Sequence, residues 1–458
     1  MIKIESCNPM PLRALLGVAV AILFLAASGC GSSRTMRAVR MNEAPRVSEV
    51  SATTVAYPLL LLHGLGQKAH VWEGAALSSY EQTLGLHFGG VLTMKNGRVQ
   101  CSKNGSGPSD FFTVSFSNPV DSVAAWSAEL EQFINEVVRR TGANKVTLVG
   151  YSMGGVASRL YLTQHQQNHR VQRLITIGSP HLGSPFARVY SLKAGIKNSL
   201  ASSSNPVSQA ILGGALSAVE ACETDMPFDA PAMRDLIPPD NAGNFLDRLG
   251  KAPHPLDVEY VSVIGNVDVI GDAQKFRTSA LQEVLRRVGE LYDNGLSALL
   301  TPGDGVVSTS SQVITNIPWF ADKQDNVRLA RTVVLKSVHT QHLQKSPEVQ
   351  RVTLEAKPEL HGSEWLLVNG VPSLVLTYND YLQPSSSVCS VSYSSMAGER
   401  SVQATDQKLV SLPTGERVCY AVIPMPDADF SAPFSVRFSI RNAYGYTTQS
   451  TKMWQPLP

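Results

Sequence analysis

Features that would place this chain in several other classes of protein are missing from it. Its 458 residues carry 39 Lys and Arg against 37 Asp and Glu, a formal net charge of +2, and no basic run is present. A nucleic-acid-binding surface needs an excess of positive charge, so this balance argues against a nucleic-acid partner. Internal repeats are also absent. With 43% hydrophobic and 17% charged residues, the chain has the composition of an ordinary globular protein, and its length suits two or three domains.

The longest apolar run lies at the N-terminus and is short for a membrane span. Lys3 and Arg13 precede this run, which extends from Ala14 to Ala27. A positive start, a short apolar run and small residues after it are typical of a secretory signal. Residues 1–29 are therefore predicted to be a signal peptide. Residues 30–51, which are polar and have no apolar period, are predicted to be a tether.

The residues that end this signal carry a more specific pattern. Ala27-Ser28-Gly29-Cys30 resembles a bacterial lipobox. The resemblance implies cleavage before Cys30 and attachment of lipid to this cysteine, which anchors an exported protein to a membrane. Gly31, rather than Asp, follows the cysteine, and this resembles the pattern of lipoproteins that are sorted to the outer membrane. We therefore expect a lipid-anchored protein of the bacterial cell envelope, at the outer membrane. A plain signal peptide with an incidental cysteine is the alternative.

Cysteine is scarce in the rest of the chain, and metal-binding clusters are missing. Cys101, Cys222, Cys389 and Cys419 allow three pairings in an oxidising compartment. Cys389 and Cys419 lie in two strand-like runs of the same C-terminal region, so we favour that bridge, and a Cys101–Cys222 bridge stays open. One His-x-x-His pair is present, but no Glu or further Cys/His cluster supports a metal site there. No cofactor and no metal is predicted.

One stretch predicts a nucleophile. Residues 146–155 form a β-branched apolar run that ends in Gly-x-Ser-x-Gly and continues into a helix-like segment. In this strand-turn-helix context, the pattern predicts a nucleophile elbow with Ser152 at its tip. Gly150 and Gly154 keep the tight turn free of Cβ clashes. An ordinary strand-to-helix turn is the alternative.

Two backbone amides are expected beside the nucleophile. The N–H of Met153 points to the same place as the Ser152 hydroxyl in such a turn. The apolar run 55–62 ends in the glycine-rich loop His63-Gly64-Leu65-Gly66. A buried strand that ends in such a loop presents backbone donors at the carboxyl edge of a parallel sheet. The sequence therefore predicts an oxyanion hole made by the amides of Leu65 and Met153.

An acid and a base follow the nucleophile in the chain, each after a strand-like run. Asp304 lies between two glycines, and His339 follows the run that ends at residue 335. The order Ser, acid, His is that of the α/β hydrolases. Asp304 is expected to orient His339, which takes the serine proton. Asp268 and Asp272 are the alternative acids, and His342 is the alternative base. His181, in a loop before any of these acids, is expected to be structural.

The remaining patterns predict a two-part architecture. Strand-like runs alternate with helical segments over residues 52–350, which predicts a mostly parallel α/β sheet. Apolar residues recur at three- and four-residue steps over 122–140 and predict a helix that stops at Gly142. Residues 84–110 are rich in Gly, Ser, Asn and Lys and are expected to form a surface excursion. Residues 186–256 interrupt the alternation and predict either a cap or lid, or an extra packing subdomain.

The pattern of apolar and polar residues changes after residue 350. Helical periods vanish from 351–458, and short alternating runs such as 434–440 lie between turn-forming residues. This pattern is typical of a small all-β domain, and we expect a sandwich. Neither a chemical motif nor a protein partner can be identified in it.

Several motifs together carry a family resemblance. They look like those of bacterial lipases and esterases of the α/β-hydrolase superfamily, over roughly residues 52–350. The motifs are His63-Gly64-Leu65-Gly66, Gly150-Tyr151-Ser152-Met153-Gly154-Gly155, Gly178-Ser179-Pro180-His181-Leu182-Gly183-Ser184, Gly303-Asp304-Gly305-Val306-Val307 and His339-Thr340-Gln341-His342-Leu343. The last resembles the superfamily's His-x-x-His-Leu ending, whose first histidine is the base.

The resemblance implies hydrolysis of carboxylic esters of lipid or acyl substrates through an acyl-serine intermediate. An acyltransferase, phospholipase or amidase uses the same residues with a different acceptor or leaving group, so these activities are alternatives. A surface-binding lipoprotein without catalytic activity is the alternative of another class.

Overall fold

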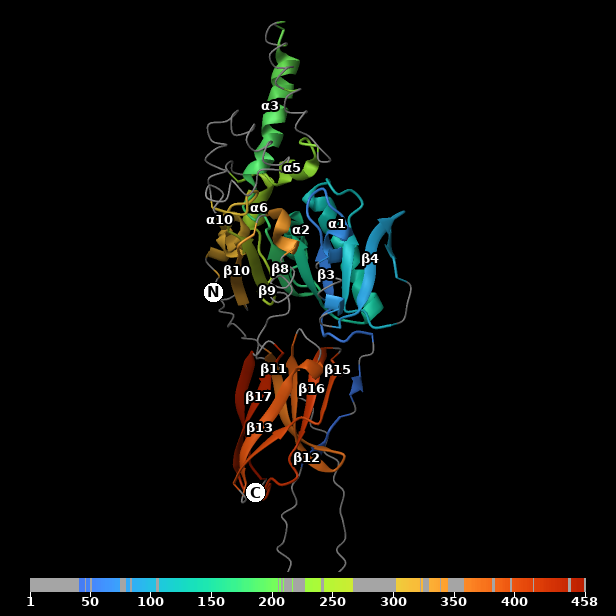
Figure 1. Ribbon diagram of the computed structural model, residues 1–458, viewed down its shortest axis with the longest axis vertical. Helices are drawn as coiled ribbons and strands as arrows, with labels where there is room; N and C mark the ends of the chain where they lie inside the picture. Colours follow the sequence, from blue (N-terminus) through green and yellow to red (C-terminus); the bar gives the residue numbers. More distant parts are fainter. Residues whose placement is uncertain are drawn as a thin grey trace, which may run out of the picture.

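The computed structural model describes residues 41–456, with gaps chiefly in 205–226, 267–301, 322–328 and 345–357. The predicted signal peptide, Cys30 and most of the tether lie outside the described residues. So do Asp268, Asp272 and Cys222. An α/β region and a β region are stacked end to end along the long axis of the molecule (Figure 1). None of the helices in the described part of the chain combines the length and apolarity that spanning a membrane requires.

The α/β region is built on one eight-stranded sheet. All neighbouring strands run parallel except the last pair, β4 and β5. The strands are β3 (Leu59–Leu62), β4 (Phe88–Lys95), β5 (Arg98–Cys101), β6 (Phe111–Ser115), β7 (Val146–Tyr151), β8 (Val171–Ile177), β9 (Glu259–Gly265) and β10 (Leu329–Leu335), in the spatial order β10-β9-β8-β7-β3-β6-β4-β5. The predicted parallel sheet is confirmed.

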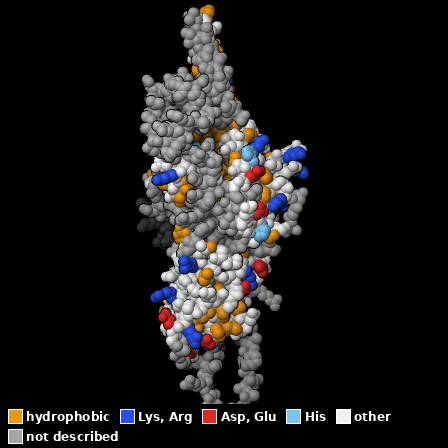
Figure 2. All heavy atoms as spheres, viewed as in Figure 1, with side chains coloured by type: hydrophobic (Ala, Val, Ile, Leu, Met, Phe, Trp, Pro, Cys, Tyr) orange, Lys and Arg blue, Asp and Glu red, His pale blue; other side chains and the backbone are white. Residues whose placement is uncertain are grey.

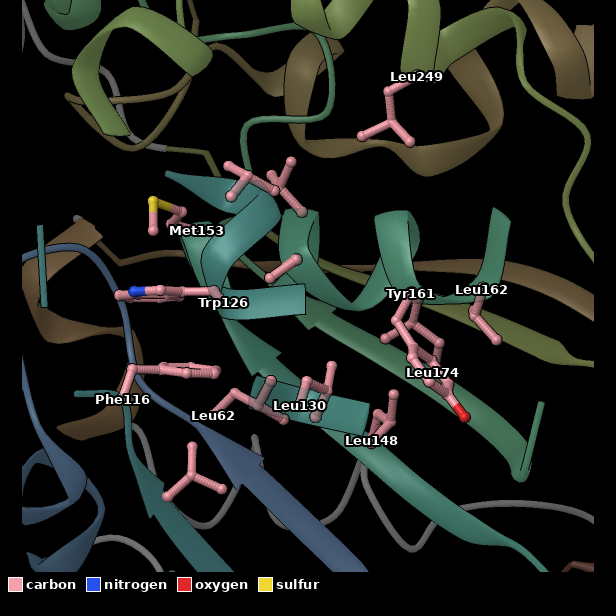
Figure 3. Packing of buried hydrophobic residues seen from close by; sticks show 14 of the residues in the cluster. Leu62, Phe116, Trp126, Leu130, Leu148, Met153, Tyr161, Leu162, Leu174 and Leu249 are labelled. Carbon is pink, nitrogen blue, oxygen red and sulfur yellow. The ribbon is translucent and has the colours of Figure 1, made fainter. Parts of the chain in front are cut away.

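Both faces of this sheet are covered by apolar side chains. Successive strand residues point to opposite faces, so Leu60 and Leu62 join one core cluster while Leu59 and Leu61 join another. Helices α1 (Val123–Thr141) and α2 (Met153–Gln164) pack on the first face. Figure 3 shows this packing, with the Trp126 ring of α1 stacked on Phe116 at 4.2 Å between ring centroids.

The helix predicted over 122–140 is confirmed as α1. The Ser122 side chain accepts a hydrogen bond from the Ala125 amide at 3.1 Å and caps the N-terminus. Gly142 ends the helix with a φ of 65°, a left-handed conformation that favours glycine. Sequence signals at both ends therefore determined this element locally.

The prediction of a surface excursion at 84–110 is wrong in large part. Strands β4 and β5 form a hairpin there and add to the edge of the sheet. Asn96 and Gly97 make its two-residue turn with φ angles of 52° and 71°, a combination that closes tight hairpins. At Gly89, a Cβ would lie 2.3 Å from the Phe112 ring, so the glycine content reflects close packing of this strand.

Three of the described α-helices lie in the interruption at 186–256. These are α3 (Arg188–Ser202), α5 (Pro231–Asp235) and α6 (Phe245–Lys251). Helix α3 projects from the end of the α/β region that faces away from the β region (Figure 1). The remaining short helices are η1 (Ala69–Trp72), η3 (Pro185–Ala187) at the start of the interruption, α10 (Thr309–Gln312), η4 (Ile314–Asn316), α11 (Pro318–Ala321), η6 (His339–Gln344) and η7 (Pro384–Ser386).

The C-terminal region is all-β, as predicted, and consists of two sheets around one core. The strands are β11 (Glu359–Val368), β12 (Val371–Asn379), β13 (Val388–Ser395), β14 (Gly398–Gln403), β15 (Asp406–Ser411), β16 (Arg417–Pro424), β17 (Phe434–Arg441) and β18 (Thr447–Trp454). One sheet has the order β14-β13-β17-β18, and the other contains β11-β12-β16-β15. Apolar residues of both sheets form a shared cluster.

The end of the predicted tether belongs to this β region. Strands β1 (Asn42–Glu43) and β2 (Ser48–Glu49) pair with β11 and β15, at opposite edges of the larger sheet. Between them, Ala44 and Val47 pack on an apolar cluster of that sheet. The sequence did not predict this pairing because the segment is polar. Two short edge strands pair through backbone groups, and here only two apolar side chains pack on the sheet.

Buried polar contacts join the two regions. Arg417 of β16 donates to Thr53 Oγ1 at 2.8 Å and to the carbonyl oxygen of Thr141, at the C-terminal end of α1. Asn379 of β12 donates to the Tyr57 hydroxyl oxygen at 2.8 Å. On the face shown in Figure 2, Lys and Arg side chains lie interspersed with Asp and Glu over both regions.

The predicted Cys389–Cys419 bridge is not formed in this structure. Both residues are free and buried, and they lie on different sheets, Cys389 on β13 and Cys419 on β16. Each packs in the apolar core between the sheets, and burial raises the pKa of the Cys389 thiol to about 11. A neutral thiol in an apolar core behaves as a small hydrophobic side chain. Cys101 is also free, and its thiol donates to the Gly89 carbonyl at 3.3 Å.

Candidate active site

Ser152 lies in the sharp turn between β7 and α2. Its φ of 52° and ψ of −123° are rare for a residue with a side chain, so the turn holds it in a strained conformation. A Cβ at Gly150 would lie 2.5 Å from the Gly155 amide nitrogen, and one at Gly154 would lie 2.7 Å from the His63 carbonyl oxygen. The turn therefore closes only with glycine at both positions, as the sequence predicted.

The structure brings the three predicted side chains into one row of hydrogen bonds. His339 Nε2 lies 2.9 Å from Ser152 Oγ, and His339 Nδ1 lies 2.7 Å from Asp304 Oδ2. The carboxylate can only accept, so Nδ1 carries the proton and Nε2 is free to accept the serine hydroxyl. All three residues are buried. The His339 amide also donates to the Asp304 carbonyl at 2.9 Å, which ties the two loops together.

The Asp304 carboxylate receives four hydrogen bonds. Its Oδ1 accepts from the amides of Val306 and Val307 at 3.0 and 2.8 Å, and its Oδ2 accepts from His339 and His342. Burial alone raises the pKa of this carboxyl, but its electrostatic interactions and hydrogen bonds with the two histidines outweigh burial and hold the pKa well below its usual range. Asp304 is therefore ionised at neutral pH.

His342, the alternative base, contacts the acid and not the nucleophile. Its Nε2 lies 2.9 Å from Asp304 Oδ2, and its Nδ1 lies 2.6 Å from Ser337 Oγ. Asp304, His339 and His342 are a donor set that could hold a cation, since their ligand atoms all lie within 4.8 Å of one another. His339 Nδ1 and His342 Nε2 already lie at hydrogen-bond distance from Asp304 Oδ2, so a bound cation would have to separate these nitrogens from that oxygen.

His181 lies apart from this row, as expected of a structural histidine. It is buried beside the Arg159 guanidinium, with 3.3 Å between its Nδ1 and the Arg159 nitrogen, and its Nε2 lies 3.1 Å from Thr176 Oγ1. Burial and the Arg159 charge hold the His181 pKa well below its usual range, so the ring is neutral. His254 also contacts Arg159, at 3.3 Å from its Nε.

The two predicted oxyanion-hole amides are available. In the loop after β3, the Gly64 amide donates to Gln67 Oε1 at 3.1 Å and the Gly66 amide donates to the Pro119 carbonyl at 2.9 Å. Among the described residues, the amides of Leu65 and Met153 donate to no other group of the chain. The Leu65 and Met153 amides border the nucleophile turn and remain free to bind a ligand oxygen.

A cavity of about 160 Å³ opens over Ser152 and His339. Most of its lining is apolar, and part comes from the 186–256 insertion, through η3, α5 and the residues after them. The apolar lining residues are Leu65, Pro180, Phe186, Ala187, Met233, Leu236, Val306 and Val307. Such a cavity suits an apolar acyl group whose carbonyl carbon lies next to the serine.

Two further residues at the site escaped the sequence analysis. The Tyr151 hydroxyl donates to the His339 carbonyl oxygen at 2.7 Å, and the Tyr151 ring lies 5.3 Å from the His339 ring. Gln67 accepts from the Gly64 amide and lines the cavity. Tyr151 occupies the first variable position of Gly-x-Ser-x-Gly, and Gln67 follows the glycine-rich loop. Their positions next to these motifs were the only sequence signal that either residue belongs to the site.

Comparison with known proteins agrees with this fold. Residues 57–193 match the family model of the alpha/beta hydrolase fold. With the parallel sheet and the turn at Ser152, this match confirms the α/β-hydrolase fold that the sequence predicted.

Particular relatives are similar over short stretches. Triacylglycerol lipases of Pseudarthrobacter phenanthrenivorans and Burkholderia plantarii are each 42% identical to this chain over 59 residues. These stretches are 13% of this chain and 18% and 16% of the two lipases, so the match spans less than a fifth of either relative. Among solved structures, the mature form of Bacillus licheniformis lipase BlEst2 aligns with a TM-score of 0.35 and 20% identity, over 68% of this chain and 95% of that one.

Proposed function

We propose that this protein is a serine hydrolase that cleaves carboxylic esters of lipid or other acyl substrates. The observation that carries the proposal is the row of hydrogen bonds from Ser152 through His339 to Asp304 beneath an apolar cavity. The similarity of short stretches to two triacylglycerol lipases supports the same class of substrate.

In the proposed reaction, Ser152 Oγ attacks the ester carbonyl carbon while His339 Nε2 takes its proton. Asp304 holds the Nδ1–H tautomer and stabilises the imidazolium. The carbonyl oxygen becomes negative and accepts from the amides of Leu65 and Met153. His339 then gives its proton to the leaving alkoxide oxygen, and the acyl group stays on Ser152. A water molecule, activated by His339, attacks this acyl-serine and releases the acid.

A fluorophosphonate probe with mapping of the modified peptide tests the nucleophile, and a series of p-nitrophenyl esters of rising acyl length tests the substrate. Label on Ser152 with ester turnover supports the proposal. Label without turnover of any ester indicates transfer to another acceptor or cleavage of another bond. Absence of label contradicts the serine mechanism and favours the surface-binding alternative.

We further propose that the chain is exported and held at the bacterial outer membrane by lipid on Cys30. The support is the lipobox resemblance of Ala27-Ser28-Gly29-Cys30 behind a short apolar run. Lipid anchoring places the hydrolase in the cell envelope, where lipid and acyl esters are available as substrates.

A further inference from the structure

A second histidine shares the carboxylate that orients the base. His342 lies in η6, three residues after His339, and is buried. Its Nε2 lies 2.9 Å from Asp304 Oδ2, the oxygen that also accepts from His339 Nδ1 at 2.7 Å. One carboxylate oxygen therefore receives two imidazole N–H groups, and only one of these rings reaches Ser152.

The protonation of His342 follows from its partners. Asp304 is an acceptor, so His342 Nε2 must carry a proton. Burial lowers the pKa of His342 and favours the neutral ring, although Asp304 opposes this effect. A neutral ring has one N–H, so its Nδ1 accepts, and the Ser337 hydroxyl at 2.6 Å donates to it. Asp304 thus selects the tautomer of His342, and the Ser337 hydroxyl donates to the nitrogen that this tautomer leaves without a proton.

The strand ends leave a fitted space for the His342 ring. A Cβ at Gly265, the last residue of β9, would lie 2.3 Å from His342 Cε1. A Cβ at Gly178, just after β8, would lie 2.8 Å from His342 Cδ2. Glycine at both positions lets the ring pass between the strand ends and reach Asp304, so backbone packing holds it in place.

We propose that His342 is a positioning residue that sets the basicity of His339 by sharing Asp304 Oδ2. This inference rests on the proposed function. An N–H donated to the carboxylate takes up part of its negative charge, and this charge is what stabilises protonated His339. With His342 in place, Asp304 still fixes the tautomer of His339, but it raises the proton affinity of His339 less than it would without His342. His339 then stays unprotonated, and able to act as a base, to lower pH.

Few other titratable groups face this pair. Among the described residues, Asp304 and His339 are the ones that act on His342, and Tyr151 faces Asp304 from β7. The hydroxyl of Tyr151 stays protonated, since burial raises its pKa further. A change at His342 therefore acts on His339 through Asp304.

The test compares the pH dependence of kcat/KM of the full-length protein with that of His342→Ala and His342→Gln. The acidic limb reports the pKa of the base in the free enzyme. We expect His342→Ala to move this limb upward by about half a unit to one unit, because one hydrogen bond to a charged group is lost. The side-chain amide of His342→Gln replaces the Nε2–H donor and should return the limb toward its native position. His165→Ala, at the far end of α2, is the control and should leave the limb unmoved.

Two outcomes overturn the inference: an acidic limb that stays in place in folded His342→Ala, or a glutamine variant that shifts as much as alanine. If His342→Ala does not fold, Ser337→Ala is used instead. It removes the donor to His342 Nδ1 and so weakens the Nε2–H bond to Asp304, which should give a smaller shift in the same direction. An unmoved limb again counts against the proposal. Histidine-selective ¹³C NMR titration of His339 in the same variants gives this answer without substrate. A failure of ester turnover therefore contradicts the proposed function alone.

Discussion

The Tyr151 hydroxyl donates a hydrogen bond of 2.7 Å to the carbonyl oxygen of His339. This contact links the residue before the proposed nucleophile to the backbone of the proposed base, across 188 positions of the chain. Tyr151 is the last residue of β7 and His339 is the first residue of η6, so the bond joins the strand that leads to Ser152 to the backbone that carries the imidazole.

Removal of this hydroxyl by Tyr151→Phe should lower kcat/KM for a p-nitrophenyl ester while changing the free energy of unfolding little. A single buried hydrogen bond is worth about 1 kcal/mol, which corresponds to a loss of roughly fivefold if the bond acts only on the position of His339. Tyr393→Phe, a buried tyrosine in the β region, is the control for loss of a hydroxyl. Native kinetics in Tyr151→Phe would mean that the contact does not position the base.

Ser152→Ala should abolish ester turnover and fluorophosphonate labelling, with a loss of about 10⁶-fold in kcat, as expected for a nucleophile in a hydrolase of this type. The melting curve should stay close to native, because the hydroxyl contacts only His339 among the described residues. Ser158→Ala is a matched control: Ser158 is a buried serine of α2 whose hydroxyl donates to the Gly154 carbonyl. Turnover near the native level in Ser152→Ala would move the nucleophile elsewhere.

Asp304→Asn should give a folded protein with turnover reduced by about 10³- to 10⁴-fold, because the amide nitrogen can no longer accept and favours the wrong tautomer of His339. The pKa of Asp304 is lower in the folded chain than in the unfolded one. Its charge therefore adds stability that is complete above about pH 4 and is lost as the pH falls further.

Chemical denaturation between pH 2 and 7 checks the second part of this prediction. The Asn variant should lose less stability on acidification than the native protein. Asp406→Asn, which changes a half-exposed carboxyl in the β region, should keep the native pH dependence. Parallel curves for the native protein and Asp304→Asn would contradict the assigned charge state.

Arg417→Met should destabilise the protein by about 1–3 kcal/mol without changing turnover below the melting temperature. The substitution leaves the Thr141 carbonyl at the end of α1 and the Thr53 hydroxyl without their donor. Arg437→Met, an exposed arginine of the same region, should have little effect. Equal melting temperatures for the two variants would show that the buried contacts do not stabilise the junction.

Cys30→Ser should release the expressed protein from membrane fractions, since lipid attachment needs the cysteine thiol. Fractionation with detection of the mature chain checks this outcome, and Cys101→Ser is the control for loss of an unrelated thiol. A Cys30→Ser protein that stays with membranes would contradict anchoring through lipid.

Elements whose signals are local were predictable from the chain alone. The turn at Ser152 could be predicted because only glycine fits at positions 150 and 154. Helix α1 could be predicted because its apolar residues recur at three- and four-residue steps and Gly142 ends it. The parallel strands other than β4 were visible as apolar runs. These features depend on residues within a few positions of one another.

Contacts between distant segments were decided only in the tertiary structure. The sequence offered His342 as an alternative base, whereas packing against Gly178 and Gly265 places it on Asp304. The β4–β5 hairpin, the edge strands β1 and β2, and the free thiols of the β core belong to the same group. Their residues have weak local preferences, so the partners that each segment meets after folding determine its structure, and a linear pattern contains no record of those partners.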